Sequence, residues 1–280
     1  MDPSDSTVVA ADKVRYKYSE NSVYAVDGAC LYAEKGAFIA VLGRNGSGKS
    51  TLAKILNALF LPESGSVTIC GIDATNEENV YLVRSHCSMV FQNPDNQIVS
   101  TIVEEDIAFG PENLGIPSDE IRKRVDSALS AVGLSDKARS APHMLSGGQK
   151  QKVAIAGALA MHSDIIVFDE ATAMLDPVGR KDIFRIVKKL NREENITVIW
   201  ITHFMEEAVD ADRVIVMDKG KAVMSGTPRE VFADVETITR LGLDVPEAAL
   251  FADTLRKDGI NIPGTILTAD EAAEALCQLL

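Results

Sequence analysis

A glycine-rich stretch near residue 45 constrains the fold of this chain more than any other feature. It fits the pattern GxxxxGK[ST] with Gly43-Arg44-Asn45-Gly46-Ser47-Gly48-Lys49-Ser50. The short apolar stretch Phe38 to Leu42 precedes it, and apolar residues at helical spacing follow it: Leu52, Ile55, Leu56 and Leu59. A buried strand, a glycine turn and an amphipathic helix in this order predict a phosphate-binding loop, because the glycines let successive backbone N–H groups turn inward around an anion.

Two residue types in this loop carry specific chemistry. Lys49 is expected to bring a point charge to the β- and γ-phosphates of a nucleotide, and Ser50 a hydroxyl ligand to Mg²⁺. We therefore predict that residues 43–50, together with the adjacent Thr51, bind the nucleotide. The alternative is a glycine-rich turn with an exposed lysine, which the flanking strand and helix disfavour.

A second apolar stretch ends in a pair of carboxylates. Ile165 to Phe168 reads as a buried strand, and Asp169 and Glu170 follow it directly. Ligand sites in α/β folds lie at such strand ends. Asp169 is expected to hold Mg²⁺, directly or through water, and Glu170 to polarise an attacking water molecule.

The order of strand and helix patterns predicts the fold class. Short apolar stretches with polar and glycine breaks in residues 7–33 indicate an antiparallel β subdomain. Strands at 165–168, 197–202 and 214–217 alternate with helices, which indicates a parallel α/β sheet covered on both faces. Helical patterns dominate between about residues 93 and 160, and this suggests an inserted helical subdomain.

The end of the chain is predicted to be a short helical extension. Residues 6–242 form the nucleotide-binding domain in this interpretation, and residues 243–280 follow it. Helices are expected at Glu247 to Leu255 and at Ala269 to Leu279.

Composition excludes several classes of function. The formal net charge is −13, from 28 basic and 41 acidic residues, and this disfavours a nucleic-acid surface. The four cysteines show no CxxC spacing, which predicts reduced thiols in a cytosolic protein. No signal peptide is recognisable, and no apolar stretch approaches the roughly 20 residues that span a bilayer. A membrane role would then be peripheral, at the cytoplasmic face.

Further short motifs follow one another in the order in which the ABC ATPase family has them, and with them the sequence resembles that family. Leu145-Ser146-Gly147-Gly148-Gln149 is similar to the family's signature. Gln92 matches the Q-loop glutamine, Asp176 the D-loop aspartate and His203 the switch histidine, while Tyr18 lies where the family stacks an aromatic ring on adenine. Tyr16, two residues away, is an alternative for that stacking role.

This resemblance implies both a fold and a reaction. The fold is a P-loop NTPase (RecA-like) core with an antiparallel β subdomain and an inserted helical subdomain. The reaction is hydrolysis of ATP with Mg²⁺, in which Glu170 is the general base and Lys49, Gln92 and His203 assist. Ser146, Gly147, Gly148 and Gln149 would contact the ATP held by a partner subunit in a head-to-tail dimer, because the free amides at a helix start attract an anion.

Within that family the chain is similar to the energy-coupling factor (ECF) ATPases. The similarity lies in four segments: Gln92 to Gln97, Glu104 to Asn113, Ala171 to Pro177 and Leu241 to Pro246. Such ATPases power uptake of vitamins or metal ions, with a membrane coupling (T) subunit and a substrate-binding membrane (S) subunit. Many systems pair two related ATPases, and this chain resembles the first, so both a homodimer and a heterodimer stay open.

Two other functions compete with this interpretation. One is a soluble ABC-type ATPase that is not coupled to transport; the acidic charge and the lack of a long coiled coil before Ser146 disfavour it. The other is a subunit that binds ATP without hydrolysing it, which the presence of Glu170 and His203 disfavours.

Overall fold

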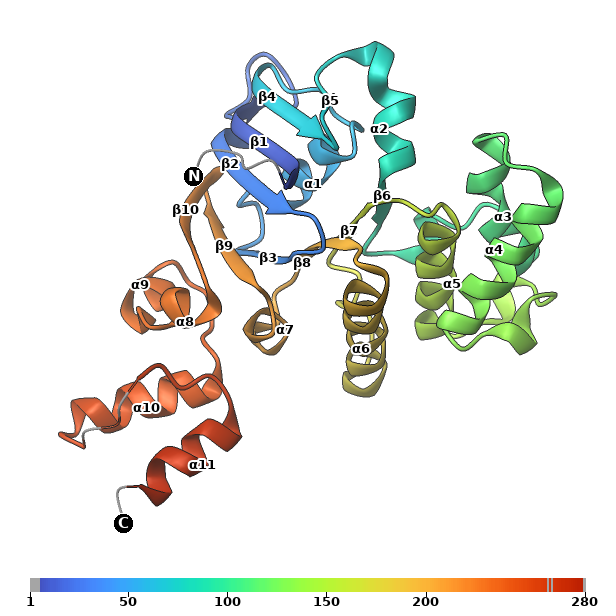
Figure 1. The fold of residues 1–280 in the computed structure, drawn as a ribbon. Coiled ribbons are helices and arrows are strands. Elements are labelled where there is room, and N and C mark those ends of the chain that lie inside the picture. The colour runs from blue at the N-terminus through green and yellow to red at the C-terminus, as the bar shows by residue number, and fades with distance from the viewer. Residues whose placement is uncertain (1–5, 261, 263, 279–280) are drawn as a thin grey trace.

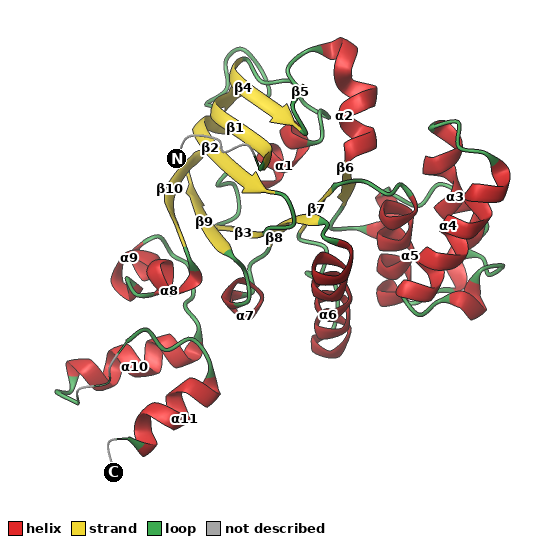
Figure 2. Ribbon diagram, in the orientation of Figure 1, coloured by secondary structure: helices red, strands yellow, loops and turns green. Residues whose placement is uncertain are grey.

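The strands form two sheets in the computed structural model, which describes residues 6–260, 262 and 264–278 (Figures 1 and 2). The larger sheet has the order β10-β9-β3-β8-β7-β6. Its strands are β3 (Phe38–Gly43), β6 (Cys87–Val90), β7 (Ile165–Asp169), β8 (Thr197–Ile201), β9 (Arg213–Asp218) and β10 (Lys221–Gly226). All neighbours pair in parallel except β10, which runs antiparallel to β9. The predicted parallel core is confirmed.

The smaller sheet is antiparallel, as the alternation in residues 7–33 predicts, and has the order β2-β1-β4-β5. It consists of β1 (Thr7–Tyr16), β2 (Val26–Glu34), β4 (Ser64–Ile69) and β5 (Ile72–Asp73). Helix α1 (Lys49–Leu56) packs with both sheets around one apolar core, and α2 (Val80–His86) leads from this sheet into β6.

The predicted helical stripe after the glycine loop was wrong at its last member. Helix α1 ends at Leu56, and Leu59 lies beyond it with 37% of its surface exposed. Ala58 has a φ of 51°, a left-handed conformation that a helix cannot continue. The side-chain amide of Asn57, at the C-cap of α1, donates a hydrogen bond to the carbonyl of Cys87, which ties the end of the helix to β6 while the chain continues toward β4.

The opposite face of the larger sheet is covered by α6 (Pro177–Glu194) and α7 (Met205–Val209). Trp200 of β8 is the centre of an aromatic cluster on this face, with ring centroids of Phe38, Phe168 and Phe184 at 5.9, 4.8 and 5.5 Å. Aromatic pairs at such separations stabilise a core beyond the area they bury. The cluster therefore ties β3, β7 and β8 to α6.

The inserted helical subdomain is also confirmed. It contains α3 (Val103–Asn113), α4 (Ser118–Ala131) and α5 (Gly147–Ala160), which stand to one side of the sheets in Figure 1. Buried side chains of α4, such as Val125 and Leu129, belong to the same apolar cluster as Ile155 and Phe168. The subdomain thus shares its core with the larger sheet.

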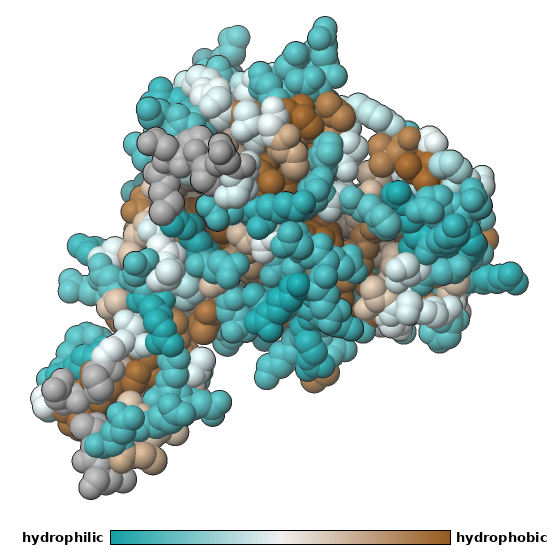
Figure 3. All heavy atoms as spheres, in the orientation of Figure 1, coloured by the Kyte–Doolittle hydropathy of each residue, from teal (hydrophilic) through white to brown (hydrophobic). Residues whose placement is uncertain are grey.

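The last part of the chain forms the predicted helical extension. After α8 (Pro228–Phe232) and α9 (Val235–Arg240) come α10 (Glu247–Lys257) and α11 (Ala269–Cys277). The last two helices share a small apolar cluster of their own that includes Ala252 and Ile266, and Figure 3 shows this unit projecting from the main body. Residue 279, predicted at the end of the last helix, lies outside the described residues. Among those described, no helix is long and apolar enough to cross a membrane.

A buried glutamate connects the loops that follow β7 and β8. Glu207 of α7 is 5% exposed and accepts hydrogen bonds from the indole N–H of Trp200 at 2.8 Å and from the hydroxyls of Thr202 and Thr172. Burial raises the pKa of this carboxyl, and the three donors oppose the rise. Thr172 and Thr202 lie two residues from Glu170 and one residue from His203, so Glu207 positions the segments that carry the candidate site.

Replacing Glu207 with leucine is expected to lower the free energy of unfolding by about 3 kcal/mol, because the Trp200 and threonine donors would be buried without acceptors. Glu207→Gln should cost less, since its amide oxygen still accepts. Glu206→Leu, next to it and exposed, is the matched control. Urea denaturation of the three variants measures the differences; an unfolding midpoint of Glu207→Leu equal to that of the control would contradict this role.

Candidate nucleotide-binding site

The glycine loop between β3 and α1 has the shape that an anion cradle needs. Gly46 and Gly48 have φ values of 79° and 103°, and a Cβ on Gly48 would lie 2.3 Å from the carbonyl oxygen of Ala25. The Ser47 carbonyl accepts a hydrogen bond from the backbone N–H of Gly220 at 2.9 Å, so the β9–β10 turn holds the loop from outside. Side chains at residues 46 and 48 would be strained, and at 48 one would collide with backbone.

The start of α1 offers positive charge to whatever the loop encloses. Lys49 is its first residue, only 4% exposed, and its Nζ donates to the carbonyls of Gly43 at 2.7 Å and Arg44 at 3.2 Å. Burial lowers the pKa of Lys49, while the nearby carboxylate of Glu170 opposes that shift. The first turn of α1 contains no acidic residue, so its N–H groups and the helix dipole also favour an anion. Ser47 Oγ is buried and has no hydrogen-bond partner within the described part of the chain.

A hydroxyl and a carboxylate face each other across the loop. Ser50 Oγ donates to Asp169 Oδ1 at 2.7 Å, which brings together the two residues predicted to hold Mg²⁺. Asp169 is 6% exposed at the end of β7, and burial raises the pKa of its carboxyl. Oxygen atoms of this kind are the ligands that Mg²⁺ prefers.

Glu170 brings three other predicted residues together. Its Oε1 lies 2.6 Å from His203 Nε2 and 3.6 Å from Lys49 Nζ, and its Oε2 accepts a hydrogen bond from Gln92 Nε2 at 3.2 Å. The contact with His203 is the main cause that lowers the pKa of this carboxyl, so it is held ionised. Glu170 adopts a left-handed φ of 51°, an uncommon conformation for a glutamate that is typical of functional sites.

The two tyrosines near the site occupy different environments. Tyr18 is 60% exposed, and its hydroxyl is 2.9 Å from Thr51 Oγ1 at the start of α1. Tyr16 stacks on Phe60 with ring centroids 4.9 Å apart and packs against the core of the smaller sheet. Tyr18 is therefore the more exposed of the two rings and the one hydrogen-bonded to α1, a difference that the sequence does not show.

The signature segment lies in a separate cavity of about 440 Å³. Ser146 is the N-cap of α5: its hydroxyl accepts from the N–H of Gln149 at 3.3 Å, and Gln149 Oε1 accepts from the N–H of Ser146 at 3.0 Å. Asp176 caps α6 on the other side of the cavity, where it accepts from the N–H of Gly179 at 2.7 Å. The described residues that line this cavity include none of residues 43–51.

Two supporting features were missed by the sequence analysis. The turn residue Gly220 contacts the glycine loop, and its signal was the Lys219-Gly220 pair between two β patterns. Glu207 positions the loops after β7 and β8, but a glutamate within a helical pattern carries no signal of burial.

Comparisons with known proteins agree with this geometry. Residues 26–173 match the family model described as ABC transporter. The chain is 56% identical to the energy-coupling factor transporter ATP-binding protein EcfA1 of Clostridium novyi (strain NT), over 98% of this chain and 99% of that one. It is 54% identical to the protein of the same name from Clostridioides difficile (strain 630), over 97% of this chain and 99% of the relative.

Solved structures show the same likeness. One is cbiO1 from Clostridium perfringens, part of the ABC transporter complex cbiONQ, with a TM-score of 0.76, 35% identity, and coverage of 89% of this chain and 100% of that one. Another is a dimeric ATP-binding cassette in a post-hydrolysis state bound to ADP and Pi, with a TM-score of 0.71, 32% identity, and coverage of 78% and 98%.

The glycine loop, the carboxylates at the end of β7 and the mixed sheet define a P-loop ATPase. Sequence and structural likeness over nearly the whole chain then show that it belongs to the ABC transporter family, among the energy-coupling factor transporter ATP-binding proteins. It is an ATPase whose hydrolysis is coupled to transport. The soluble alternative is not favoured, because these relatives are transporter subunits.

Proposed function

We propose that this chain hydrolyses ATP at the site between β3, β7 and β8, and that hydrolysis powers uptake of a vitamin or metal ion across the cell membrane. The observation that carries the catalytic part is the environment of Glu170. Its side chain is 13% exposed and is contacted by Lys49, Gln92 and His203. A largely buried carboxylate that these neighbours keep ionised carries no proton of its own and can accept one from water at the γ-phosphate.

The remaining residues divide the binding of the nucleotide between them. The N–H groups of residues 43–51 and the ammonium of Lys49 would hold the phosphates, and the ring of Tyr18 would stack on adenine. Ser50 and Asp169, whose oxygens already meet at 2.7 Å, fit Mg²⁺, with Gln92 as a further oxygen donor. Mg²⁺, when bound, supplies charge neutralisation of the β- and γ-phosphates.

His203 is the second group beside the reacting water in this proposal. Its Nε2 lies 2.6 Å from Glu170 Oε1, so the ring and the carboxylate are oriented by each other. The imidazole would hold the water and the γ-phosphate oxygen in line, a positioning role. Gln92 reaches the same carboxylate from the loop after β6 and would report the state of the site to that loop.

Glu170→Gln is expected to reduce steady-state ATP hydrolysis at least a hundredfold while ATP still binds, because an amide cannot accept the proton from water. Fluorescent-nucleotide binding and phosphate release measure the two properties. Glu193→Gln, on the exposed surface of α6, is the control. Hydrolysis within a factor of three of the control would rule out Glu170 as the general base.

The signature is proposed to act on the ATP of a partner subunit. Ser146 and Gly147 are exposed at the start of α5, in a cavity whose lining contains none of the described loop residues 43–51. The N–H groups at the start of a helix favour an anion. Residues 43–51 of the same chain, which would hold the phosphates, do not reach this cavity. A head-to-tail dimer, formed with a second copy or a related ATPase, would place the γ-phosphate there.

Mixing two inactive chains tests this shared site. Lys49→Ala removes the cation of the loop, and Gly147→Asp puts a negative charge at the signature. In a mixed dimer of the two variants, one site combines the intact loop of the Gly147→Asp chain with the intact signature of the Lys49→Ala chain. Hydrolysis by the mixture should therefore recover to between a quarter and a half of the wild-type rate. Each variant alone is the control. A mixture that forms dimers, shown by differently tagged chains, and stays inactive would contradict action in trans.

The membrane contact is proposed at a groove between the sheets and the helical subdomain. The groove has a volume of about 230 Å³, and Gln97, Val99 and Phe109 belong to its lining. Val99 and Phe109 are 64% and 50% exposed, a combination typical of a protein contact. We propose that a cytoplasmic helix of the membrane coupling subunit docks there and that the substrate-binding membrane subunit joins through it. The chain would then lie peripherally at the cytoplasmic face of the membrane.

A cysteine at Asn96 or Val99 should crosslink to the coupling subunit in the assembled transporter, with a yield that changes when ATP is added. A cysteine at Glu193, on the exposed surface of α6, is the matched control and should not react with that subunit. The native exposed Cys277 is replaced by serine beforehand. Crosslinks confined to ATPase pairs, with or without ATP, would overturn the docking assignment.

A further inference from the structure

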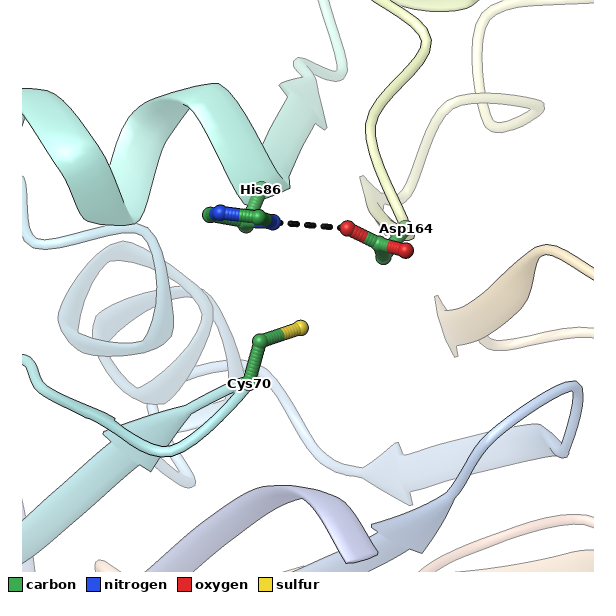
Figure 4. A group of neighbouring side chains, drawn as sticks. All are labelled: Cys70, His86 and Asp164. Atoms are coloured by element: carbon green, nitrogen blue, oxygen red, sulfur yellow. Dashed lines mark hydrogen bonds and ion pairs between the residues drawn. The ribbon is translucent and has the colours of Figure 1, made fainter. Parts of the chain in front are cut away.

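A cysteine, a histidine and an aspartate converge on the side of the molecule where the two sheets meet (Figure 4). One ligand atom of each of Cys70, His86 and Asp164 lies within 4.8 Å of those of the other two. His86 Nδ1 is 2.7 Å from Asp164 Oδ2, and the Sγ of Cys70 points toward this pair. All three side chains are partly buried, so a small ion can reach them from solvent.

The three residues come from different parts of the fold. Cys70 is in the turn between β4 and β5 of the smaller sheet, His86 is the last residue of α2, and Asp164 directly precedes β7 of the larger sheet. Backbone hydrogen bonds to neighbouring strands hold two of these residues in place. The N–H of Cys70 donates to the carbonyl of Val8 at 2.7 Å, and the carbonyl of Asp164 accepts from the N–H of Thr197 at 2.9 Å. The fold itself thus brings these side chains together.

The side-chain types select the kind of ion. Thiolate sulfur with imidazole nitrogen and a carboxylate oxygen is a ligand set for Zn²⁺ and similar first-row transition ions, whereas Mg²⁺ and Ca²⁺ prefer oxygen alone. Bond lengths of about 2.0–2.3 Å in a tetrahedral site separate the ligand atoms by about 3.3–3.8 Å. The present separations, from 2.7 Å to at most 4.8 Å, reach that range with side-chain shifts of roughly 1 Å.

A redox role for Cys70 is less consistent with its surroundings. Burial raises the pKa of this thiol to about 11, which makes it a poor nucleophile without a cation. An ion at His86 and Asp164 would instead stabilise the thiolate directly.

We propose that Cys70, His86 and Asp164 form a binding site for Zn²⁺ or a similar transition ion, separate from the nucleotide site, with water at the fourth position. On binding, the Cys70 S–H loses its proton to solvent and an S–Zn bond forms, the hydrogen bond between His86 Nδ1 and Asp164 Oδ2 breaks as the neutral imidazole moves its proton to Nε2, and no oxidation state changes. Because its ligands lie in the turn between β4 and β5, at the end of α2 and directly before β7, the ion joins the antiparallel subdomain to the larger sheet. Occupancy stabilises the folded chain, since the unfolded chain does not hold the three ligands together.

The test uses the full chain, stripped with a chelator and kept in excess Mg²⁺ so that the oxygen site at Ser50 and Asp169 is occupied. Calorimetric titration with Zn²⁺ should give one site per chain, and saturating Zn²⁺ should raise the melting temperature by roughly 5 °C. Titration with Co²⁺ should produce a thiolate-to-metal charge-transfer band, which reports the sulfur ligand.

The variants separate this site from any other. Cys70→Ser should remove the cobalt band, and His86→Gln and Asp164→Asn should weaken Zn²⁺ binding at least tenfold. Cys277→Ser, which removes an exposed thiol on α11, is the matched control and should bind as the wild type does. An absent cobalt band, or Zn²⁺ affinity unchanged in Cys70→Ser, would overturn the proposal. If Cys70→Ser does not fold, unchanged affinity in both His86→Gln and Asp164→Asn overturns it equally.

Discussion

The site depends on the register of three buried parallel strands. Ile201 of β8 pairs with Val41 of β3 on one side and with Asp169 of β7 on the other. Because parallel strands end at the same edge of a sheet, this register delivers the glycine loop, the two carboxylates and His203 to one place. The aromatic cluster around Trp200 and the hydrogen bonds of Glu207 stabilise that register on the face of the sheet that packs against α6 and α7.

Burial decides how the charges of the site behave. Lys49, Asp169 and Glu170 are all largely removed from solvent, where an isolated charge would be costly. Each is instead placed beside an opposite charge or a donor: Lys49 beside Glu170, Asp169 beside Ser50, and Glu170 beside His203. This local compensation explains how a chain of net charge −13 can bind a polyanion.

The helical subdomain and the loop after β6 relate differently to the sheet edge that carries the site. The helical subdomain carries the signature at the start of α5, exposed and away from its own glycine loop. The loop after β6 brings Gln92 to Glu170 and continues toward the groove at Val99. The site is therefore connected by a direct contact to the groove proposed for a membrane partner, whereas the signature faces away from it, toward a proposed second subunit.

The sequence by itself determined the elements that local rules control. The glycine pattern before an amphipathic helix and the apolar stretch ending in Asp169 and Glu170 are short-range signals, and the structure has both in their predicted place. Ser146 and Asp176 act equally locally, each as the N-cap of the helix that follows it. The roles of Gln92, Asp176 and His203 were predicted from the family resemblance.

Only the tertiary structure decided what depends on residues far apart in the chain. Tyr16 and Tyr18 are alike in sequence, but Tyr16 stacks face to face on Phe60, whereas Tyr18 meets that ring edge-on, is exposed and contacts Thr51. The burial of Glu207, the support of the glycine loop by Gly220, and the meeting of Cys70, His86 and Asp164 follow from strand order and crossovers. Periodicity and spacing carry no record of such contacts, because they arise only when separate elements pack against one another.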